Sequence, residues 1–222
     1  MVSYYINRTI NYFVQNLGGM VTKVKICGIT CRTDVEYINE FKPEFAGFVM
    51  FFPKSKRNVD TKTAQALVSQ LDNSIKSVAV MVSPTLDQIK QAESCGFDYL
   101  QIHGELSDKT LEAVKIPVFR AFNVTDIDKM NKYENNKNIA GFVFDAHTPG
   151  SGKTFDWSLL KDIPHSNKLF VLAGGLNIQN VEQAILNVKP DVVDVSSGVE
   201  GEKCKDKQKI SKFIDIVRQT VV

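Results

Sequence analysis

Hydrophobic residues recur along this chain in short, nearly continuous runs that are rich in Val, Ile and Phe. Such runs are typical of parallel strands that are covered on both faces. Between the runs, hydrophobic residues recur at i, i+3, i+4 and i+7, the spacing of one helix face, as in 64–71, 181–188 and 210–217. The segment 156–160 is too short for more than one or two helical turns. The predicted strands are 24–27, 45–49, 77–82, 99–102, 118–122, 141–144, 169–172 and 192–195.

One strand and one helix alternate with a period of about 24 residues, which favours a closed barrel or an open doubly wound sheet. A nucleotide-binding open sheet carries a glycine-rich loop after its first strand, whereas CGIT (27–30) has no GxGxxG pattern. We therefore predict an α/β fold, a single (β/α)8 TIM barrel over residues 20–222.

The first 19 residues lack the continuous apolar core and the cleavage site of a signal peptide. A domain-like segment, VTKVKICGIT, begins directly after Met20. Two interpretations of 1–19 stay open: an extension upstream of the domain, or an N-terminal helix packed outside it.

Charge and composition narrow the class of partner. The formal net charge is +2 and the lysines are scattered, so neither a nucleic acid nor a membrane surface is an expected partner. No apolar stretch approaches about 18 residues, so no transmembrane helix is expected. The four cysteines, Cys27, Cys31, Cys95 and Cys204, form no CxxC pair. We expect reduced thiols and a cytoplasmic location.

In a (β/α)8 barrel, chemistry is placed at the carboxyl ends of the strands. Gly174 and Gly175 follow the seventh predicted strand, and Ser196, Ser197 and Gly198 follow the eighth. Glycines let backbone N–H groups approach an anion, and serines add hydroxyl donors. Because these two loops are neighbours in a barrel, they predict a phosphate site, although either loop alone would suggest only a tight turn.

A second glycine-rich segment, Gly152-Lys153-Thr154, resembles the end of a P-loop. The full pattern needs glycine at 147, where His147 stands, so a nucleotide-binding P-loop is not expected. A flexible loop at the barrel mouth that covers substrate is the alternative.

Six segments resemble the signatures of phosphoribosylanthranilate isomerases, in the same order and across residues 23–218. They are KICGIT (25–30), GFVMFFPKSKRNV (47–59), QIHGE (101–105), FDAHTPGSGKTFDW (144–157), LAGGLN (172–177) and VDVSSGVEG (193–201). The resemblance implies the Amadori rearrangement of N-(5-phosphoribosyl)anthranilate, with no metal and no organic cofactor. The expected partner is a small phosphorylated substrate, and the chain is expected to be a monomer or a homodimer.

That reaction needs one acid, which protonates the ribose ring oxygen, and one base, which removes a proton from C2′. By resemblance, Cys27 is the base and Asp145 the acid. Without the resemblance, Cys27 would suggest a buried small hydrophobe and Asp145 a cap. Apolar walls such as Phe51 and Phe52 could keep Asp145 protonated, and Lys25 could favour the Cys27 thiolate if it points toward the mouth.

By the same resemblance, Arg57 holds the anthranilate carboxylate, for which a planar guanidinium is well suited. His103 is expected to line the mouth without an assigned role. The sequence departs from the family pattern at Lys56, where proline is common, and in slightly short loops at 147–153 and 199–205. These departures concern loop closure and affinity rather than the reaction.

Other functions were weighed against the same positions. A histidine-pathway isomerase would need aspartate where Cys27 stands, and an indole-glycerol-phosphate synthase would need catalytic lysines where only Lys25 is available. A non-catalytic phosphate-binding barrel would be expected to lack Cys27 or Asp145, and both are present. A structural partner subunit would need a large exposed apolar stripe, which the sequence does not show.

The domain pattern begins at about Thr22, so a chain that starts at Met20 is expected to fold and to keep its activity. Thermal unfolding and an isomerase assay on that shorter chain test this expectation. A large loss of either stability or activity would show that residues 1–19 belong to the domain.

Overall fold

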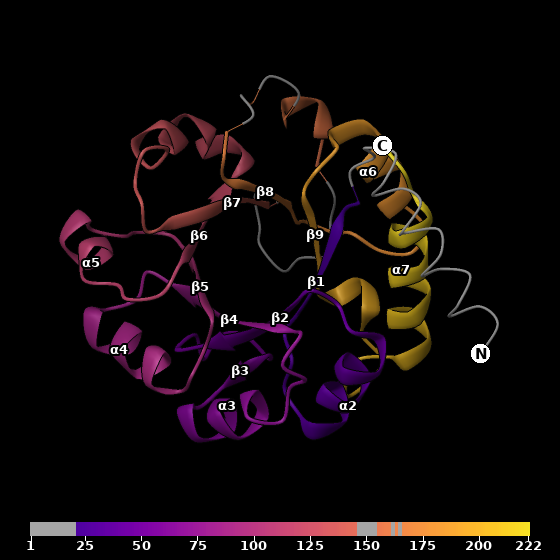
Figure 1. Ribbon diagram of the computed structural model, residues 1–222, viewed down its shortest axis with the longest axis horizontal. Coiled ribbons are helices and arrows are strands. Elements are labelled where there is room, and N and C mark those ends of the chain that lie inside the picture. Colours follow the sequence, from indigo (N-terminus) through magenta and orange to yellow (C-terminus); the bar gives the residue numbers. More distant parts are fainter. Residues whose placement is uncertain (1–20, 146–154, 161–162, 164–165) are drawn as a thin grey trace.

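The computed structural model describes residues 21–145, 155–160, 163 and 166–222. Within this part of the chain, eight parallel strands form a ring, which closes where β1 pairs with both β2 and β9 (Figure 1). A two-residue strand, β3 (Asn58–Val59), is added beside the end of β2. The predicted (β/α)8 barrel is confirmed. The strands of the ring are β1 (Lys23–Cys27), β2 (Phe45–Met50), β4 (Lys76–Val82), β5 (Tyr99–His103), β6 (Val118–Asn123), β7 (Ile139–Asp145), β8 (Leu169–Leu172) and β9 (Val192–Val195).

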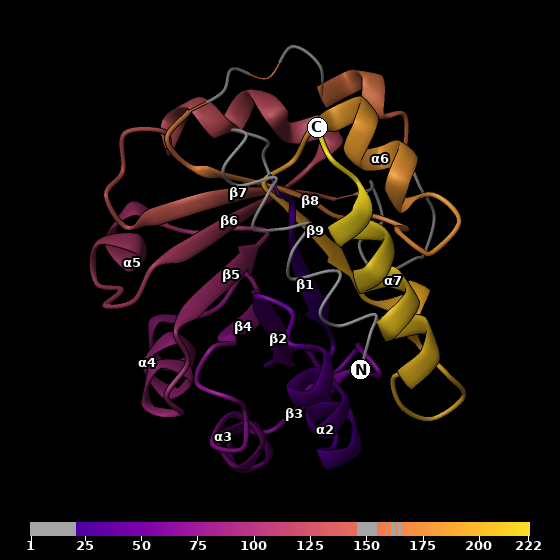
Figure 2. The ribbon, with the colours of Figure 1, turned by 45° about the vertical axis from the view of Figure 1, so that its right-hand side comes forward.

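Helices cover the outside of the ring (Figures 1 and 2). Several helices have an N-cap residue whose side chain accepts a hydrogen bond from a backbone N–H of the first turn. These residues are Asp60 before α3, Thr85 before α4 and Asp206 before α7. The segment after β7 is a short 3-10 turn, Trp157–Leu160, as the sequence predicts. The α-helices are α2 (Arg32–Phe41), α3 (Thr61–Val68), α4 (Leu86–Ser94), α5 (Asp108–Glu112), α6 (Val181–Val188) and α7 (Lys207–Gln219). In the described part of the chain, none has the length and hydrophobicity needed to cross a bilayer.

Side chains fill the barrel interior in layers that differ in polarity. At the amino-terminal side, the rings of Tyr99 and Phe119 stack with their centroids 4.9 Å apart, and Phe45 meets both edge-on. Nearer the carboxyl ends, buried polar groups replace these rings, including Lys25, Gln101 and Asp194. The barrel interior is therefore filled by aromatic rings at the amino-terminal side and by polar groups toward the carboxyl ends of the strands. This arrangement places the chemistry at the carboxyl ends.

Asp34, on the first turn of α2, joins the first and last βα loops. Its side chain is fully buried, and Oδ2 accepts hydrogen bonds from the Thr30 N–H (2.8 Å) and hydroxyl (3.1 Å). Its other oxygen, Oδ1, accepts from the Lys205 N–H at 2.7 Å, across 171 residues of sequence. One carboxylate thus satisfies backbone donors from both ends of the domain.

Replacing Asp34 with alanine is expected to destabilise the fold by about 3 kcal/mol, because it leaves buried N–H groups without an acceptor. Asp87 is a matched control, since it is an exposed aspartate in the first turn of α4. Asp87→Ala should cost less than about 1 kcal/mol, the range for a charge at an exposed helix start. Urea unfolding of both variants measures the difference, and equal losses would refute the role given to Asp34.

Candidate active site

A pocket of about 900 Å³ opens at the carboxyl ends of the strands. Eight of the nine site residues predicted from the sequence line it, and Gly198 lies just outside the lining. The eight are Cys27, Arg57, His103, Asp145, Gly174, Gly175, Ser196 and Ser197. The fold therefore brings together side chains and loops that the sequence separates by more than a hundred residues. The glycine-rich segment 152–154 and the loop 147–153, including His147, lie outside the described residues.

Cys27 ends β1 and lies above a buried charge pair. The Lys25 ammonium is fully buried and lies 2.8 Å from Asp194 Oδ2. A Cβ added at Gly47 would come within 2.8 Å of the Cys27 sulfur and 3.1 Å of the Lys25 nitrogen. The bare backbone of Gly47 therefore makes room for the thiol and the ammonium side by side.

The pKa of Cys27 is raised above the ordinary value, and the main cause is burial. The Lys25 charge acts in the opposite direction, as expected from the sequence, but it does not overcome burial. Burial also opposes the charge on Lys25, yet its pKa is raised overall, chiefly by the charge of Asp194, so this ammonium stays charged. The Cys27 thiol therefore lies beside the Lys25 cation.

Asp145 ends β7 and is 9% exposed. Phe52 lines the same pocket, which agrees with the predicted apolar wall. The expectation for Phe51 is wrong: its ring packs on the core outside the barrel, and it is not part of the pocket lining. The cause is local, because Phe51 has a left-handed backbone with φ of 57°, which breaks the strand alternation after β2.

Arg57 reaches the pocket across Gly28, where an added Cβ would lie 2.5 Å from the arginine Cδ. Its Nε donates to Glu200 Oε1, and Lys56 holds the other oxygen of Glu200 at 2.9 Å. Partial burial opposes the charge on Glu200, but Arg57, Lys56 and Lys205 lower its pKa to about 2. Glu200 is thus a permanent anion that fixes the direction of the Arg57 guanidinium.

The two loops predicted to bind phosphate are in contact. Gly174 and Gly175 have left-handed backbones, with φ of 86° and 67°. A side chain at Gly198 would collide with the Leu176 carbonyl, so the second loop can meet the first only because residue 198 is glycine. Beside them, the buried Lys205 ammonium donates to the Ser196 carbonyl at 3.0 Å.

His103 ends β5 and contacts Gln101, with 2.8 Å between the Gln101 amide nitrogen and His103 Nε2. Burial, with Lys25 and Arg120 nearby, lowers the pKa of His103 to about 3. The imidazole is therefore neutral at physiological pH, and it can donate one hydrogen bond and accept another without carrying charge.

Comparison with known proteins decides the family. A family model described as N-(5'phosphoribosyl)anthranilate (PRA) isomerase matches residues 24–216. The chain belongs to the PRA isomerase family. The N-(5'-phosphoribosyl)anthranilate isomerase of Thermoanaerobacter pseudethanolicus is 43% identical over 204 residues, which cover 89% of this chain and 98% of that protein. The enzyme of the same name from Clostridium acetobutylicum is 40% identical and covers 90% of this chain and 99% of its own length.

Solved structures of PRA isomerases support the same family assignment. The crystal structure of phosphoribosyl anthranilate isomerase from Thermotoga maritima has a TM-score of 0.79 and 34% identity, and covers 89% of this chain and 98% of its own. Another phosphoribosyl anthranilate isomerase structure, with a TM-score of 0.77, 33% identity and the same coverage, is a complex with reduced 1-(o-carboxyphenylamino)-1-deoxyribulose 5-phosphate.

Several groups in this PRA isomerase pocket were not predicted from the sequence. Asp194 and Gln101 each stand two residues before a predicted site residue, Ser196 and His103, so strand alternation was the available signal. Arg120 donates to the backbone carbonyls of Ile102 and Gly104. It does not stand two residues from a predicted site residue, so strand alternation did not point to it. Glu200 and Lys205, which contact Arg57 and Ser196 beside the pocket, were not predicted either.

We predict that His103 stays neutral between pH 5 and 8. The unfolded chain takes up this proton near pH 6.5 but the folded protein only near pH 3, so His103 lowers stability as the pH falls below 6.5. Nitrogen-15 NMR of the imidazole should show no titration in this range, with His103→Gln identifying the signal. A midpoint near 6.5 would contradict the assignment.

Proposed function

We propose that this chain converts N-(5-phosphoribosyl)anthranilate to 1-(2-carboxyphenylamino)-1-deoxyribulose 5-phosphate in tryptophan biosynthesis. The observation that supports this most strongly is the joint placement of Cys27 and Asp145 on one pocket, with two glycine-containing loops at its edge. Membership of the PRA isomerase family supports the same reaction.

The proposed substrate pose follows the charges of the pocket. The phosphate would lie against Gly174, Gly175 and the 196–198 loop, near the Lys205 ammonium. The anthranilate carboxylate would bind the Arg57 guanidinium, which Glu200 orients. The ribose would then lie between these two ends, within reach of the strand ends that carry Cys27 and Asp145.

In the proposed mechanism, Asp145 gives its proton to the ribose ring oxygen, and the ring opens to an iminium. The Cys27 thiolate then takes the proton from C2′, which gives an enolamine that becomes the ketone. Isolated cysteine and aspartate prefer the opposite protonation states near neutral pH. The Lys25 charge favours the Cys27 thiolate, which is the direction that the mechanism requires.

Each chemical step is a proton transfer that these side chains can perform, so the proposal requires no metal and no organic cofactor. Location in the cytoplasm and assembly as a monomer or homodimer stay predictions. One structural relative, from Thermotoga maritima, consists of monomers made from a dimeric phosphoribosylanthranilate isomerase.

The direct test of the proposed function is a fluorescence assay of the purified chain. Phosphoribosylanthranilate should disappear and the deoxyribulose product should form at a rate proportional to enzyme concentration. Loss of substrate only by spontaneous hydrolysis to anthranilate would refute the proposal.

Cys27→Ser and Asp145→Asn should each lower kcat by at least about 100-fold, the lower range for a positioned acid or base. A serine hydroxyl is a far weaker base than a thiolate, and an amide has no proton to give at useful acidity. Single-turnover kinetics measure the step, and binding of the reduced product analogue shows that each variant keeps its pocket. If either variant turned over at the normal rate, the pair would be misassigned and His103 would be the next candidate.

Arg57→Ala should weaken substrate binding by about 1.5–3 kcal/mol, the usual scale for a hydrogen bond to a charged group. Arg57→Lys should recover only part of this, since an ammonium cannot form two parallel bonds to a carboxylate. Steady-state KM values and analogue titrations report the change. Unchanged binding in both variants would remove Arg57 from the carboxylate site.

A further inference from the structure

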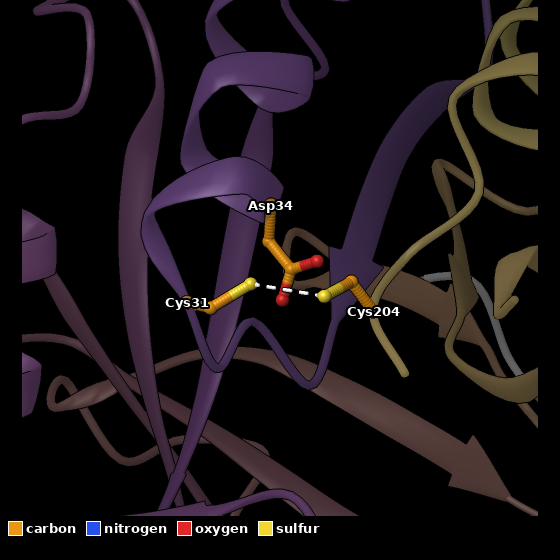
Figure 3. Close-up of side chains that lie close together, drawn as sticks. All are labelled: Cys31, Asp34 and Cys204. Carbon is orange, nitrogen blue, oxygen red and sulfur yellow. Dashed lines mark hydrogen bonds between the residues drawn. The ribbon is translucent and has the colours of Figure 1, made fainter. Parts of the chain in front are cut away.

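Two cysteines that the mechanism does not use lie in contact, although 173 residues separate them in the sequence. The sulfurs of Cys31 and Cys204 are 3.4 Å apart and point toward each other (Figure 3). Cys31 directly precedes α2, and Cys204 lies in the segment that leads to α7. Both side chains are partly exposed, so a small molecule can reach them.

Asp34 lies beside the two sulfurs, and the three possible ligand atoms are within 4.8 Å of one another. Both oxygens of this buried carboxylate already accept hydrogen bonds, from Thr30 and from the Lys205 N–H. Structural zinc needs four ligands, and this cluster can offer only two thiols without breaking the Asp34 contacts. The cluster is therefore better suited to chemistry between the two sulfurs than to a metal ion.

The backbone around the pair is already held in place. Asp34 ties residue 30 to residue 205, so the direct chain neighbours of Cys31 and Cys204 are linked by hydrogen bonds in the reduced protein. A disulfide bond is about 2.05 Å long, so the sulfurs must approach by about 1.4 Å from their separation of 3.4 Å. The proposal requires this movement to come from rotation of the two side chains, because the Asp34 contacts hold the loops in place.

We propose that Cys31 and Cys204 are a redox modification site, at which a reversible disulfide fastens the first βα loop to the last. The bond joins the loop that follows Cys27 to the segment that carries Glu200 and Lys205. It would hold both sides of the pocket rim in the arrangement seen in the reduced protein. This inference does not depend on the proposed reaction.

The oxidant is a low-molecular-weight disulfide such as oxidised glutathione. One cysteine thiolate attacks it, breaks its sulfur–sulfur bond, forms a mixed disulfide and releases one glutathione thiolate. The second cysteine thiolate then displaces the other glutathione. Two electrons pass to glutathione, and the two protons lost by the cysteines end on the two glutathione thiolates.

Burial, with the neighbouring Cys204 and Asp34 side chains, raises the pKa of Cys31 to about 11. The Cys31 thiolate is therefore scarce at neutral pH, and attack by Cys31 should be slow there and faster as the pH rises. The reaction is best followed at mildly alkaline pH.

The bond would close a loop that contains almost the whole barrel, and the stabilisation by a disulfide grows with loop length. The oxidised chain should therefore melt at least about 5 °C above the reduced chain. Cys31→Ser and Cys204→Ser should abolish this shift. Cys95→Ser is the matched control, because Cys95 is also a free thiol but its sulfur contacts the Thr61 carbonyl instead of another sulfur.

The experiment treats the full chain with oxidised glutathione, and maps disulfides by mass spectrometry after trypsin digestion. The expected result is a link between residues 26–32 and 204–205, the loss of two hydrogens from the intact chain, and a higher melting temperature that dithiothreitol reverses. The first peptide also contains Cys27. A link that persists in Cys31→Ser would therefore run through Cys27 and overturn the proposal.

Other outcomes also overturn it. Stable glutathione adducts without the internal link would show that the two sulfurs cannot meet. An internal link with no rise in melting temperature would show that it does not fasten the loops. Zinc binding in equimolar amount to the reduced chain, lost in both serine variants, would make the cluster a metal site instead.

Discussion

Lys25 and Asp194 lie opposite each other on β1 and β9, the strands at which the barrel closes. Their 2.8 Å contact is buried in the barrel interior. A single buried charge costs several kcal/mol, so neither residue is tolerated there without the other. The pair forms only when the first strand meets the last. Closure of the fold and assembly of the site are therefore one event.

The pair also decides what Cys27 can do. Two residues along a strand return a side chain to the same face, so the thiol stands directly above the ammonium. The apolar layer of Phe45, Tyr99 and Phe119 lies on the other side and keeps the charges from water. In this setting the Lys25 charge lowers the pKa of Cys27, and burial of the thiol raises it. The catalytic proposal depends on substrate binding to shift that balance.

Strand alternation and the strand ends sufficed to predict the barrel and to bring Cys27, His103 and Asp145 to one pocket. The same alternation could have identified Asp194 and Gln101. It could not have identified Glu200, whose partner Arg57 is 143 residues away, because such pairs depend on how two loops meet in space. Phe51 was misplaced for a related reason: one residue with positive φ reverses the face of the chain, and no sequence pattern marked it.

Charged side chains at and beside the pocket form ion pairs with one another. Four cations, Lys25, Lys56, Arg57 and Lys205, face two carboxylates, Asp194 and Glu200. The carboxylates let the cations lie close together, where they would otherwise repel one another. Among these six side chains the cations exceed the carboxylates by two, and Arg57 and Lys205 lie where a carboxylate and a phosphate would enter. Because Glu200 contacts three of the cations, it holds the rim in place before any anion arrives, and binding then requires little rearrangement.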